Sequence, residues 1–420
     1  MKRLRFIDLF AGAGGLSEGF IRAGFEAISH VEMDKAACFT LRTRAAYHYL
    51  VENGQIDEYR KYLRGELSRT DLYALVPNEK LEAVINLSIG EENNSKIFTE
   101  IDKSLNGYKV DLIIGGPPCQ AYSLVGRARD KNKMEGDPRN FLFLEYAKYL
   151  DRYKPKVFVF ENVTGLFSAK GGYYLEEMKS RFLESGYKIK VHPVEANHFG
   201  VLQNRKRLII IGWDQSTDLS NLDLSKVKIP YSAKVADLFK DLPDLQAGEG
   251  CFKSGRYSGE KSEYLNWAGI RNGIPELTLH VARPHSEQDK EIYRKVANQW
   301  NESGTRMLYN ELEDRLKTHE NRHSFHDRFK VVAPDKSFSH TVVAHIHKDG
   351  HYYIHPDVSQ NRSISVREAA RIQSFPDDFY FESVKQETGK GPAFKQIGNA
   401  VPPLLAFQIA IILKNHINCD

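Results

Sequence analysis

A cysteine follows two glycines and two prolines early in this chain. Residues 115–119 read Gly-Gly-Pro-Pro-Cys and come directly after the mostly apolar run 110–114. The glycines free the backbone, while the prolines fix φ and remove two N–H donors, so this turn holds one side chain rigidly. That side chain is Cys119, a soft nucleophile that reacts as its thiolate. A free cysteine is commonly a small buried hydrophobic residue, but ligands bind at the carboxyl ends of such strands, which favours a nucleophile here.

A carboxylate and two arginines follow other apolar runs. Glu161 ends the next apolar strand pattern, in the same structural position as Cys119, and residues 203–207 read Gln-Asn-Arg-Lys-Arg before a further one. Strand alternation would put Arg205 and Arg207 on one face, where they could clamp a nucleotide or orient a base. Taken alone, the carboxylate could also be a paired structural group and the basic run a solvated surface patch.

A glycine turn follows the first apolar run. Residues 8–15 read Asp-Leu-Phe-Ala-Gly-Ala-Gly-Gly, and Glu32 stands twenty residues after Gly12 at the end of the next strand pattern. An acid at that place accepts hydrogen bonds from ribose hydroxyls, so we expect an adenosine-containing cofactor. The third glycine of a dinucleotide fingerprint would fall at Ser17, which disfavours NAD and a nicotinamide oxidoreductase. A plain structural turn is the simpler alternative.

Alternating strands and helices must position these groups. The helical patterns include residues 15–23 and 140–153, and between such patterns lie apolar runs rich in Val, Ile and Phe, as strands buried on both faces are. This alternation predicts the α/β class with a doubly wound, mostly parallel sheet. The expected strands are 5–10, 25–31, 109–114, 156–160, 187–194 and 207–213.

The sequence predicts two domains. Residues 1–214 form the first, with a polar, helix-like insertion at about 47–101, and the C-terminal segment 394–420 completes it. The alternation ends near residue 214, so residues 215–393 are expected to form a second, smaller, irregular domain and hinge. Within it, residues 365–368 form a capping box that opens a helix.

Composition limits the class of protein. Hydrophobic residues make up 41% and charged residues 27%, which is typical of a globular chain, and the net charge of +4 permits nucleic-acid binding without requiring it. Four scattered cysteines form no CxxC pair, which argues against a disulfide framework and for a reducing cytosol. No signal peptide is seen and the apolar stretch 404–413 is too short for a bilayer, so we expect a cytoplasmic protein without membrane contact.

Eight of the fifteen histidines fall within residues 319–355. No cysteine lies nearby and the spacing of His345 and His347 matches no known zinc site, so we expect no metal.

Six motifs resemble those of the cytosine-5 DNA methyltransferases, both in their residues and in their order along the chain. The resemblance covers both ends of the chain and most of its first half, but not 47–101 or 215–320. It implies a Rossmann-like fold of the S-adenosyl-L-methionine-dependent methyltransferases and a bacterial DNA (cytosine-5-)-methyltransferase of restriction–modification type. The matching motifs are residues 8–15, 116–120, 161–163, 203–207, 367–376 and 396–403.

The resemblance also implies a mechanism. Cys119 would add as thiolate to carbon-6 of a cytosine flipped out of the duplex, and Glu161 would hydrogen-bond the ring nitrogen and exocyclic amine. Arg205 and Arg207 would hold the base and stabilise developing charge. Carbon-5 would then take a methyl group from S-adenosyl-L-methionine.

Further residues carry over by their place in the motifs. The second domain would recognise the target in double-stranded DNA, with phosphate contacts setting affinity and a few side chains setting sequence. A cognate restriction endonuclease is the expected functional partner, and the chain is expected to be monomeric. The implied cofactor residues are Phe10, Gly12, Gly14, Glu32, Met33, Asp102, Pro118, Asn399 and Val401, and the implied DNA-binding residues are Gln120, Ser123, Arg127, Gln203, Arg322, Arg328, Lys330 and Lys348.

Two alternatives share this fold. A transfer-RNA cytosine methylase has the same motifs and a Cys-Phe-Thr signature in its target region, but here that tripeptide is residues 38–40, near the cofactor end. A catalytically inactive DNA-binding homologue is disfavoured because Cys119, Glu161, Arg205 and Arg207 are all present.

Overall fold

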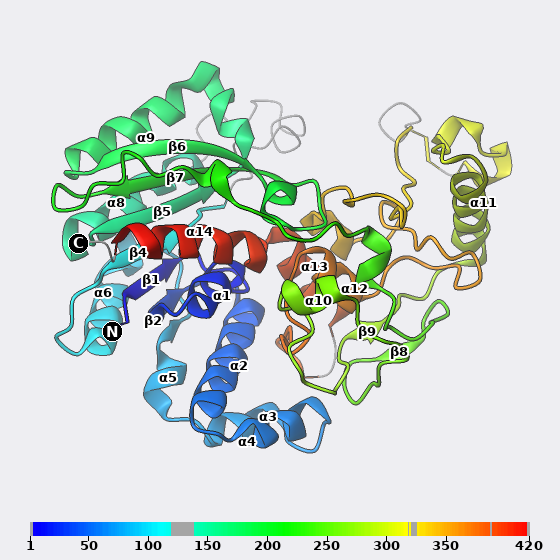
Figure 1. Ribbon diagram of the computed structural model, residues 1–420, viewed down its shortest axis with the longest axis horizontal. Coiled ribbons are helices and arrows are strands. Elements are labelled where there is room, and N and C mark those ends of the chain that lie inside the picture. The colour runs from blue at the N-terminus through cyan, green and yellow to red at the C-terminus, as the bar shows by residue number, and fades with distance from the viewer. Residues whose placement is uncertain (1–2, 119–137, 318, 321–325, 387–388, 418–420) are drawn as a thin grey trace.

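A mixed β-sheet forms the core of the left-hand part of the molecule in Figure 1. The structure is a computed structural model that describes residues 3–118, 138–317, 319–320, 326–386 and 389–417. Within these residues the sheet has seven strands in the order β3-β2-β1-β4-β5-β7-β6. Its strands are β1 (Arg5–Leu9), β2 (Glu26–Val31), β3 (Val84–Ile85), β4 (Leu112–Gly115), β5 (Val157–Asn162), β6 (Lys188–Glu195) and β7 (Lys206–Trp213).

The strands from β3 to β5 in this order are parallel, and β7 runs antiparallel to both β5 and β6. The predicted α/β class with a doubly wound, mostly parallel sheet is therefore confirmed. All six predicted strands are present, with ends that differ by at most three residues from those expected.

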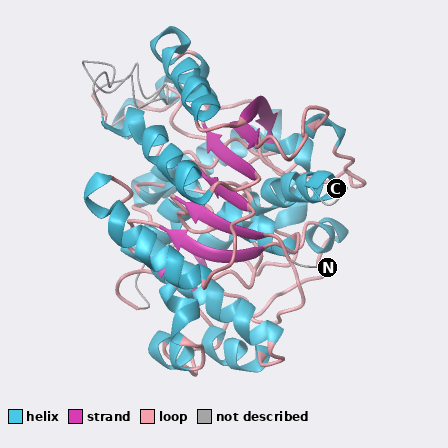
Figure 2. Cartoon of the chain, turned by 90° about the vertical axis from the view of Figure 1, so that its left-hand side faces the viewer, coloured by secondary structure: helices cyan, strands magenta, loops and turns pink. Residues whose placement is uncertain are grey.

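Helices cover both faces of the sheet (Figure 2). One face packs Phe6, Ile114 and Val159 against α1 (Gly15–Arg22) and α14 (Pro403–Ile417). The other face packs alternate residues of the same strands against three more helices. Because both faces are buried, the strands are continuous apolar runs, as the sequence suggested. The three helices are α6 (Glu91–Leu105), α8 (Leu142–Tyr153) and α9 (Tyr173–Glu184).

The end of the chain returns to its beginning. Helix α13 (Lys390–Asn399) leads into α14, which lies directly on α1: a Cβ atom at Gly19 would stand 2.4 Å from the Cβ of Ala406. By length and composition the helical stretch 390–417 could cross a membrane, but 72% of its most apolar window is buried inside the protein, as in a core helix.

The segment expected to be one insertion contains part of the sheet. Strand β3 pairs with β2 through His30 and Val84, and α6 packs on the sheet, so the expectation that all of 47–101 is an insertion is wrong at its second half. The excursion is a set of helices beyond α2 that ends before residue 84. Helix α2 spans Lys35–Glu52, and the helices beyond it are α3 (Ile56–Leu63), α4 (Arg69–Ala74) and α5 (Asn78–Glu82).

Beyond β7 the described chain is mostly irregular. Helix α11 (Glu287–Ser303) stands at the far end with a small core of its own that includes Tyr293 and Phe329 (Figure 1). The other elements are α10 (Glu263–Trp267), α12 (Val366–Ile372), β8 (Gly250–Cys251) and β9 (His280–Val281). Short 3-10 turns are η1 (Pro138–Phe141), η2 (Thr164–Phe167), η3 (Ala169–Gly172), η4 (Ala196–Phe199), η5 (Leu224–Lys226), η6 (Val235–Leu238), η7 (Tyr309–Glu311), η8 (Asp314–Leu316) and η9 (Ala344–His347).

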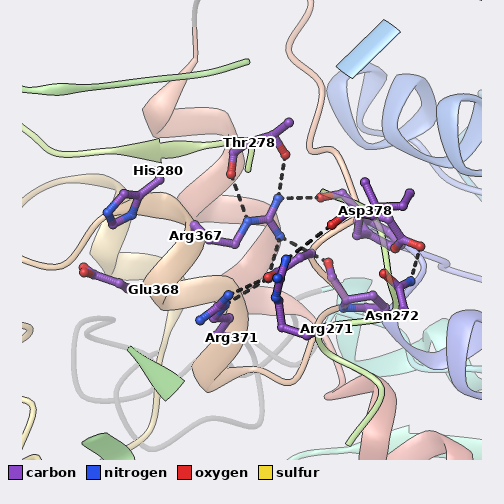
Figure 3. A network of polar contacts seen from close by, with 12 residues as sticks. Arg271, Asn272, Thr278, His280, Arg367, Glu368, Arg371 and Asp378 are labelled. Carbon is purple, nitrogen blue, oxygen red and sulfur yellow. Dashed lines mark hydrogen bonds and ion pairs between the residues drawn. The ribbon is translucent and has the colours of Figure 1, made fainter. Parts of the chain in front are cut away.

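Helix α12 begins at the predicted capping box, in which the Ser365 hydroxyl accepts from the Glu368 N–H and the Glu368 carboxylate accepts from the Ser365 N–H. Its arginines anchor it in a buried polar network (Figure 3). Arg371 donates to Asp241 and Asp377 at 2.6 Å each. Burial alone would raise the pKa of Asp377, but the charge of Arg371 outweighs it and lowers that pKa.

The network reaches the first helix of the sheet domain. Arg44 of α2 binds Glu18 of α1 with two hydrogen bonds of 2.8 and 2.7 Å and Asp378 with one of 2.9 Å. All three side chains are less than one-tenth exposed. Such pairs are costly to break, since the remaining partner stays buried and charged.

Candidate active site

Polar residues gather where the parallel strands end. The carboxyl ends of β1, β2, β3, β4 and β5 meet at one edge of the sheet, which is where ligands bind in folds of this class. Glu161 is the penultimate residue of β5, Glu32 follows β2, and residues 116–118 follow β4. The chemistry expected of this chain is therefore concentrated at this edge.

Glu161 and Arg207 form an ion pair on neighbouring strands. The Nε of Arg207 lies 2.6 Å from Oε1 of Glu161, and the two side chains are only 13% and 14% exposed. A second nitrogen of Arg207 donates to the carbonyl of Lys206 at 2.7 Å, which fixes the guanidinium. Oε2 of Glu161 has no hydrogen-bond partner among the described residues.

Gly116 lets the turn after β4 approach this carboxylate. A Cβ atom at residue 116 would stand 2.6 Å from Oε2 of Glu161 and 2.8 Å from its carbonyl oxygen. A side chain would therefore displace the carboxylate or the turn. The structure brings Glu161 beside the Gly-Pro-Pro segment, and Pro118, the last described residue of this turn, is exposed. Cys119, Gln120, Ser123 and Arg127 lie outside the described residues.

The glycine turn and Glu32 form a second group at the same edge. Oε2 of Glu32 accepts from the N–H of Gly12 at 2.8 Å, and Oε1 accepts from the N–H of Asp34 at 2.7 Å. Phe10, Gly12 and Gly14 all have positive φ, and a Cβ atom at Gly12 would meet nothing within 4 Å. Burial raises the pKa of Glu32, and the backbone donors oppose that shift.

This group fits an adenosine-containing cofactor. Each oxygen of Glu32 holds one backbone N–H and keeps capacity to accept from ribose hydroxyls. The open side of the turn at Gly12 leaves the backbone accessible, and Met33 beside it is 66% exposed. These are the features that the glycine turn and the acid led us to expect.

Asn86 is a residue of this site that the sequence analysis missed. It follows the two-residue strand β3, and its Nδ2 donates to the carbonyls of Glu32 and Met33 at 3.1 and 3.0 Å. In the sequence it is a polar residue directly after the apolar pair Val84 and Ile85. A strand of two residues is too short to show the alternation by which a strand is recognised.

Asp102 is not at this edge, and its assignment to the cofactor site is wrong. It lies in the last turn of α6, where it pairs with Arg152 and accepts from the hydroxyl of Tyr153 at 3.1 Å. Helix α6 runs from the end of β3 back to the start of β4, so its C-terminal turn lies at the opposite edge of the sheet. Asn86 stands where that residue was expected.

The C-terminal segment meets the glycine turn as expected. The carbonyl oxygen of Val401 would stand 2.2 Å from a Cβ atom at Gly15, so the two segments touch directly. Asn399 ends α13 with an exposed side chain, and Val401 is buried. Both predicted residues therefore lie beside the group that fits the cofactor.

Gln203 and Arg205 lie elsewhere than predicted. Gln203 is fully buried, so it is not a DNA-facing residue, and Arg205 is 1% exposed. Arg205 donates to the carbonyls of Val342, Gly398 and Ala400. Since β7 begins at Lys206, the strand alternation that paired Arg205 with Arg207 does not extend to it. The expectation that Arg205 holds the base together with Arg207 is corrected accordingly, because its guanidinium binds main-chain carbonyls whereas that of Arg207 binds Glu161.

The expected DNA contacts of the second domain differ in their surroundings. Arg328 lies 3.5 Å from Asp349, and Lys330 lies 2.8 Å from Asp327, so both cations already have acidic partners. Lys348 is exposed, and Arg322 lies outside the described residues. The histidines are partly structural: His340 is half-buried and bonds to the carbonyl of Tyr352, and its burial lowers its pKa to about 4.

Sequence comparison decides the family. The sequence profile described as C-5 cytosine-specific DNA methylase matches residues 4–72 and 80–415. The chain belongs to this family. It is 41% identical to the Type II methyltransferase M.Bpa9945I of Bacillus paralicheniformis, over 98% of this chain and 99% of that protein. It is 32% identical to the Type II methyltransferase M1.HphI of Haemophilus parahaemolyticus, over 99% and 88% of the two chains.

Solved structures agree on the fold. A prophage-encoded E. coli protein assigned as a DNA modification methyltransferase superposes with a TM-score of 0.65 at 23% identity, over 99% of both chains. The S. pombe Dnmt2 methyltransferase superposes with a TM-score of 0.51 at 16% identity, over 98% of this chain and 99% of that one. The family match and the two relatives confirm the predicted activity: the chain is a DNA (cytosine-5-)-methyltransferase.

Proposed function

We propose that this methyltransferase moves a methyl group from S-adenosyl-L-methionine to carbon-5 of a cytosine flipped out of a specific DNA duplex, through a transient bond to Cys119. The observation that carries the proposal is the Glu161–Arg207 pair held against Gly116. The same turn ends in Cys119 three residues later. A carboxylate and a guanidinium at the sheet edge, with a thiol that follows in the sequence, suit a flat pyrimidine ring.

The division of labour follows from the chemistry of cytosine. Carbon-5 is a poor nucleophile until a group adds beside it, so addition of the Cys119 thiolate at carbon-6 divides one hard step into two easier ones. Glu161 would accept through Oε2 from the exocyclic amine, and from the ring nitrogen once thiolate addition has made that nitrogen basic enough to take up a proton. Arg207 keeps that carboxylate oriented through Oε1. Loss of the carbon-5 proton then allows the thiolate to leave. Extrusion of the base costs a few kcal/mol, which the protein must repay by binding it.

The cofactor would lie over the glycine turn. Glu32 would accept from the ribose hydroxyls, Met33 would cover the adenine, and Phe10, Gly12 and Gly14 would present backbone to the ligand. Pro118, Asn399 and Val401 would close the pocket from the other side. When bound, S-adenosyl-L-methionine supplies an electrophilic methyl group.

The biological setting would be a restriction–modification system. Both cited relatives are named Type II methyltransferases, which supports a role in protecting host DNA from a cognate endonuclease. We propose that the enzyme acts as a monomer in the bacterial cytoplasm, on double-stranded DNA.

Bisulfite sequencing tests this proposal. DNA from a host that lacks cytosine-5 methylation is sequenced after expression of the wild-type enzyme or of Cys119→Ala. The wild type should leave every copy of one short sequence methylated at one cytosine, and the variant should leave none. Methylated transfer RNA with unmodified DNA would contradict the proposal.

A further inference from the structure

Two buried side chains hold the main chain of the second domain at Val342. The N–H of Val342 donates to Oε1 of Gln203 at 3.0 Å, and its carbonyl accepts from Nη1 of Arg205 at 2.7 Å. Neighbouring backbone adds to this contact, because the N–H of Asn204 donates to the carbonyl of Ser339 at 2.7 Å. Segment 339–344 is therefore fixed to residues 203–205 from both sides.

The same arginine holds the turn that follows α13. Nη2 of Arg205 donates to the carbonyls of Gly398 and Ala400 at 3.2 and 2.8 Å. These carbonyls flank Asn399, which the proposed function places in the cofactor pocket. Carbonyls at the C-terminal end of a helix have no partner within the helix, so a buried donor must satisfy them. Arg205 does so while it also holds Val342.

Gln373 completes this arrangement. Its Nε2 donates to the carbonyls of Ile397 and Ala400 at 2.7 and 3.1 Å, and its Oε1 accepts from Nε2 of Gln203 at 2.6 Å. Gln203, Arg205 and Gln373, here called the buried hub, are each at most 1% exposed. The hub therefore joins segment 339–344 to the turn 397–400 through hydrogen bonds that water cannot replace.

The two segments also touch directly. A Cβ atom at Gly398 would stand 2.4 Å from the backbone nitrogen of Ala344 and from the carbonyl carbon of Val343. There is thus no space for one segment to move toward the other. Val343 is 44% exposed on the outer side of this segment, within the second domain that is expected to meet DNA.

We propose that Arg205 is a positioning residue that couples DNA binding by the second domain to cofactor binding at Asn399. This inference rests on the proposed function, which assigns the cofactor to that turn. If DNA displaces segment 339–344, the carbonyl of Val342 and the turn 398–400 must move together or lose buried hydrogen bonds. A site that senses both ligands in this way makes each change the affinity for the other by the same factor.

A matched control separates coupling from simple stability. Arg367 is also a fully buried arginine, and it donates to three backbone carbonyls, those of Thr278, Pro376 and Phe379. None of these belongs to segment 339–344 or to the turn 397–400. Lysine cannot reproduce the planar fork of arginine, so Arg205→Lys and Arg367→Lys each remove carbonyl contacts from the interior. Only the first removes them from the hub.

The experiment measures the affinity for S-adenosyl-L-homocysteine by calorimetry, alone and with a duplex that carries the recognition sequence found by bisulfite sequencing. The ratio of the two dissociation constants is the coupling factor. We expect about fivefold or more for the wild type and for Arg367→Lys. For Arg205→Lys the coupling factor should fall below about twofold. The affinity for S-adenosyl-L-homocysteine without DNA should change less than the affinity with DNA. Gln373→Met, which removes the bonds to Ile397 and Ala400, should lower the coupling factor in the same way. It replaces Arg205→Lys in the test if that variant does not fold.

The inference is overturned if Arg205→Lys keeps the wild-type coupling factor, if Arg367→Lys loses it equally, or if the wild type shows a factor of one. Failure of the wild type to bind S-adenosyl-L-homocysteine at all would instead contradict the proposed cofactor site, and this inference with it. A wild type that binds the ligand without coupling leaves the proposed function intact and removes only the hub's role.

Discussion

Arg207 Nε lies 2.6 Å from one carboxylate oxygen of Glu161, across the antiparallel pair β5 and β7, while the other oxygen faces the glycine of the Gly-Pro-Pro-Cys turn. Among the described residues Arg207 holds one oxygen of Glu161, and the proposed function gives the other oxygen to the substrate. This division makes separate predictions for the carboxylate, the arginine and the glycine.

Glu161→Gln should lower the rate of methyl transfer by about 10²- to 10⁴-fold, since the amide cannot take the place of the carboxylate at the base. Single-turnover methylation of a target duplex measures this rate, and a gel-shift assay should show that duplex binding persists. Glu195→Gln is the matched control, because Glu195 pairs with Lys206 on the neighbouring strand but is 37% exposed. Near-normal transfer by Glu161→Gln would show that the carboxylate is structural.

Arg207→Met should slow transfer and leave the KM for S-adenosyl-L-methionine close to that of the wild type, because Arg207 contacts the carboxylate and not the cofactor group. Steady-state kinetics with each substrate varied in turn separate the two effects. Lys206→Met should remain active, since that side chain is 59% exposed. An equal loss in both variants would argue against a specific role for the ion pair.

Gly116→Ala should abolish most transfer although it adds a single methyl group. The new Cβ would stand 2.6 Å from Oε2 of Glu161, so the carboxylate or the turn must move. Gly391→Ala is the control, because a Cβ there meets nothing within 4 Å. Thermal unfolding of both variants should show intact folds. A fully active Gly116→Ala enzyme would mean that the close contact between residue 116 and Glu161 is not needed for transfer.

Stability should depend on pH through Glu18. Burial alone would raise its pKa, but Arg44 and His48 outweigh this and hold it well below the ordinary value of 4.5. A carboxyl group with a lowered folded-state pKa contributes stability that is present above the unfolded pKa and is lost as pH falls through the folded one. Glu18→Gln should cost about 3–5 kcal/mol at pH 7, because it leaves Arg44 with one buried partner fewer.

Urea unfolding between pH 7 and pH 3 tests that prediction. The difference in unfolding free energy between wild type and Glu18→Gln should shrink as the pH falls below about 4.5. A constant difference over the whole range would show that the ionised carboxylate of Glu18 is not the source. Glu66→Gln is a control, since Glu66 is paired with Arg64 but exposed.

The sequence predicted the sheet and the chemistry at its edge more closely than it predicted the polar interior. Strand periodicity and turn residues identify β1, β2, β4 and β5, and residues that follow a parallel strand must lie at one edge, so Glu32 and Glu161 could be found. Strand β3 has two residues and gives no periodic signal. The sequence analysis therefore missed Asn86 and assigned Asp102 to the cofactor site.

Buried polar groups were the other source of error. Strand alternation and the family resemblance placed Arg205 at a ligand surface, and the resemblance placed Gln203 there, although both are buried. Their burial depends on carbonyls from residues 342, 372, 398 and 400, which are far away in sequence. No local pattern reports such partners. The motif was recognised correctly, but the role of each residue within it depends on the folded chain.

The central claim, that Cys119 bonds to the target cytosine, is tested most directly with a duplex that carries 5-fluorocytosine at the target position. Fluorine cannot leave carbon-5 as a proton does, so the adduct should persist after methyl transfer. Mass spectrometry of the digested complex should find the peptide containing Cys119 joined to a methylated fluorocytosine nucleotide, and Cys119→Ala should give no adduct. Methylation of ordinary DNA without any trapped adduct, or an adduct on another residue, would contradict the account.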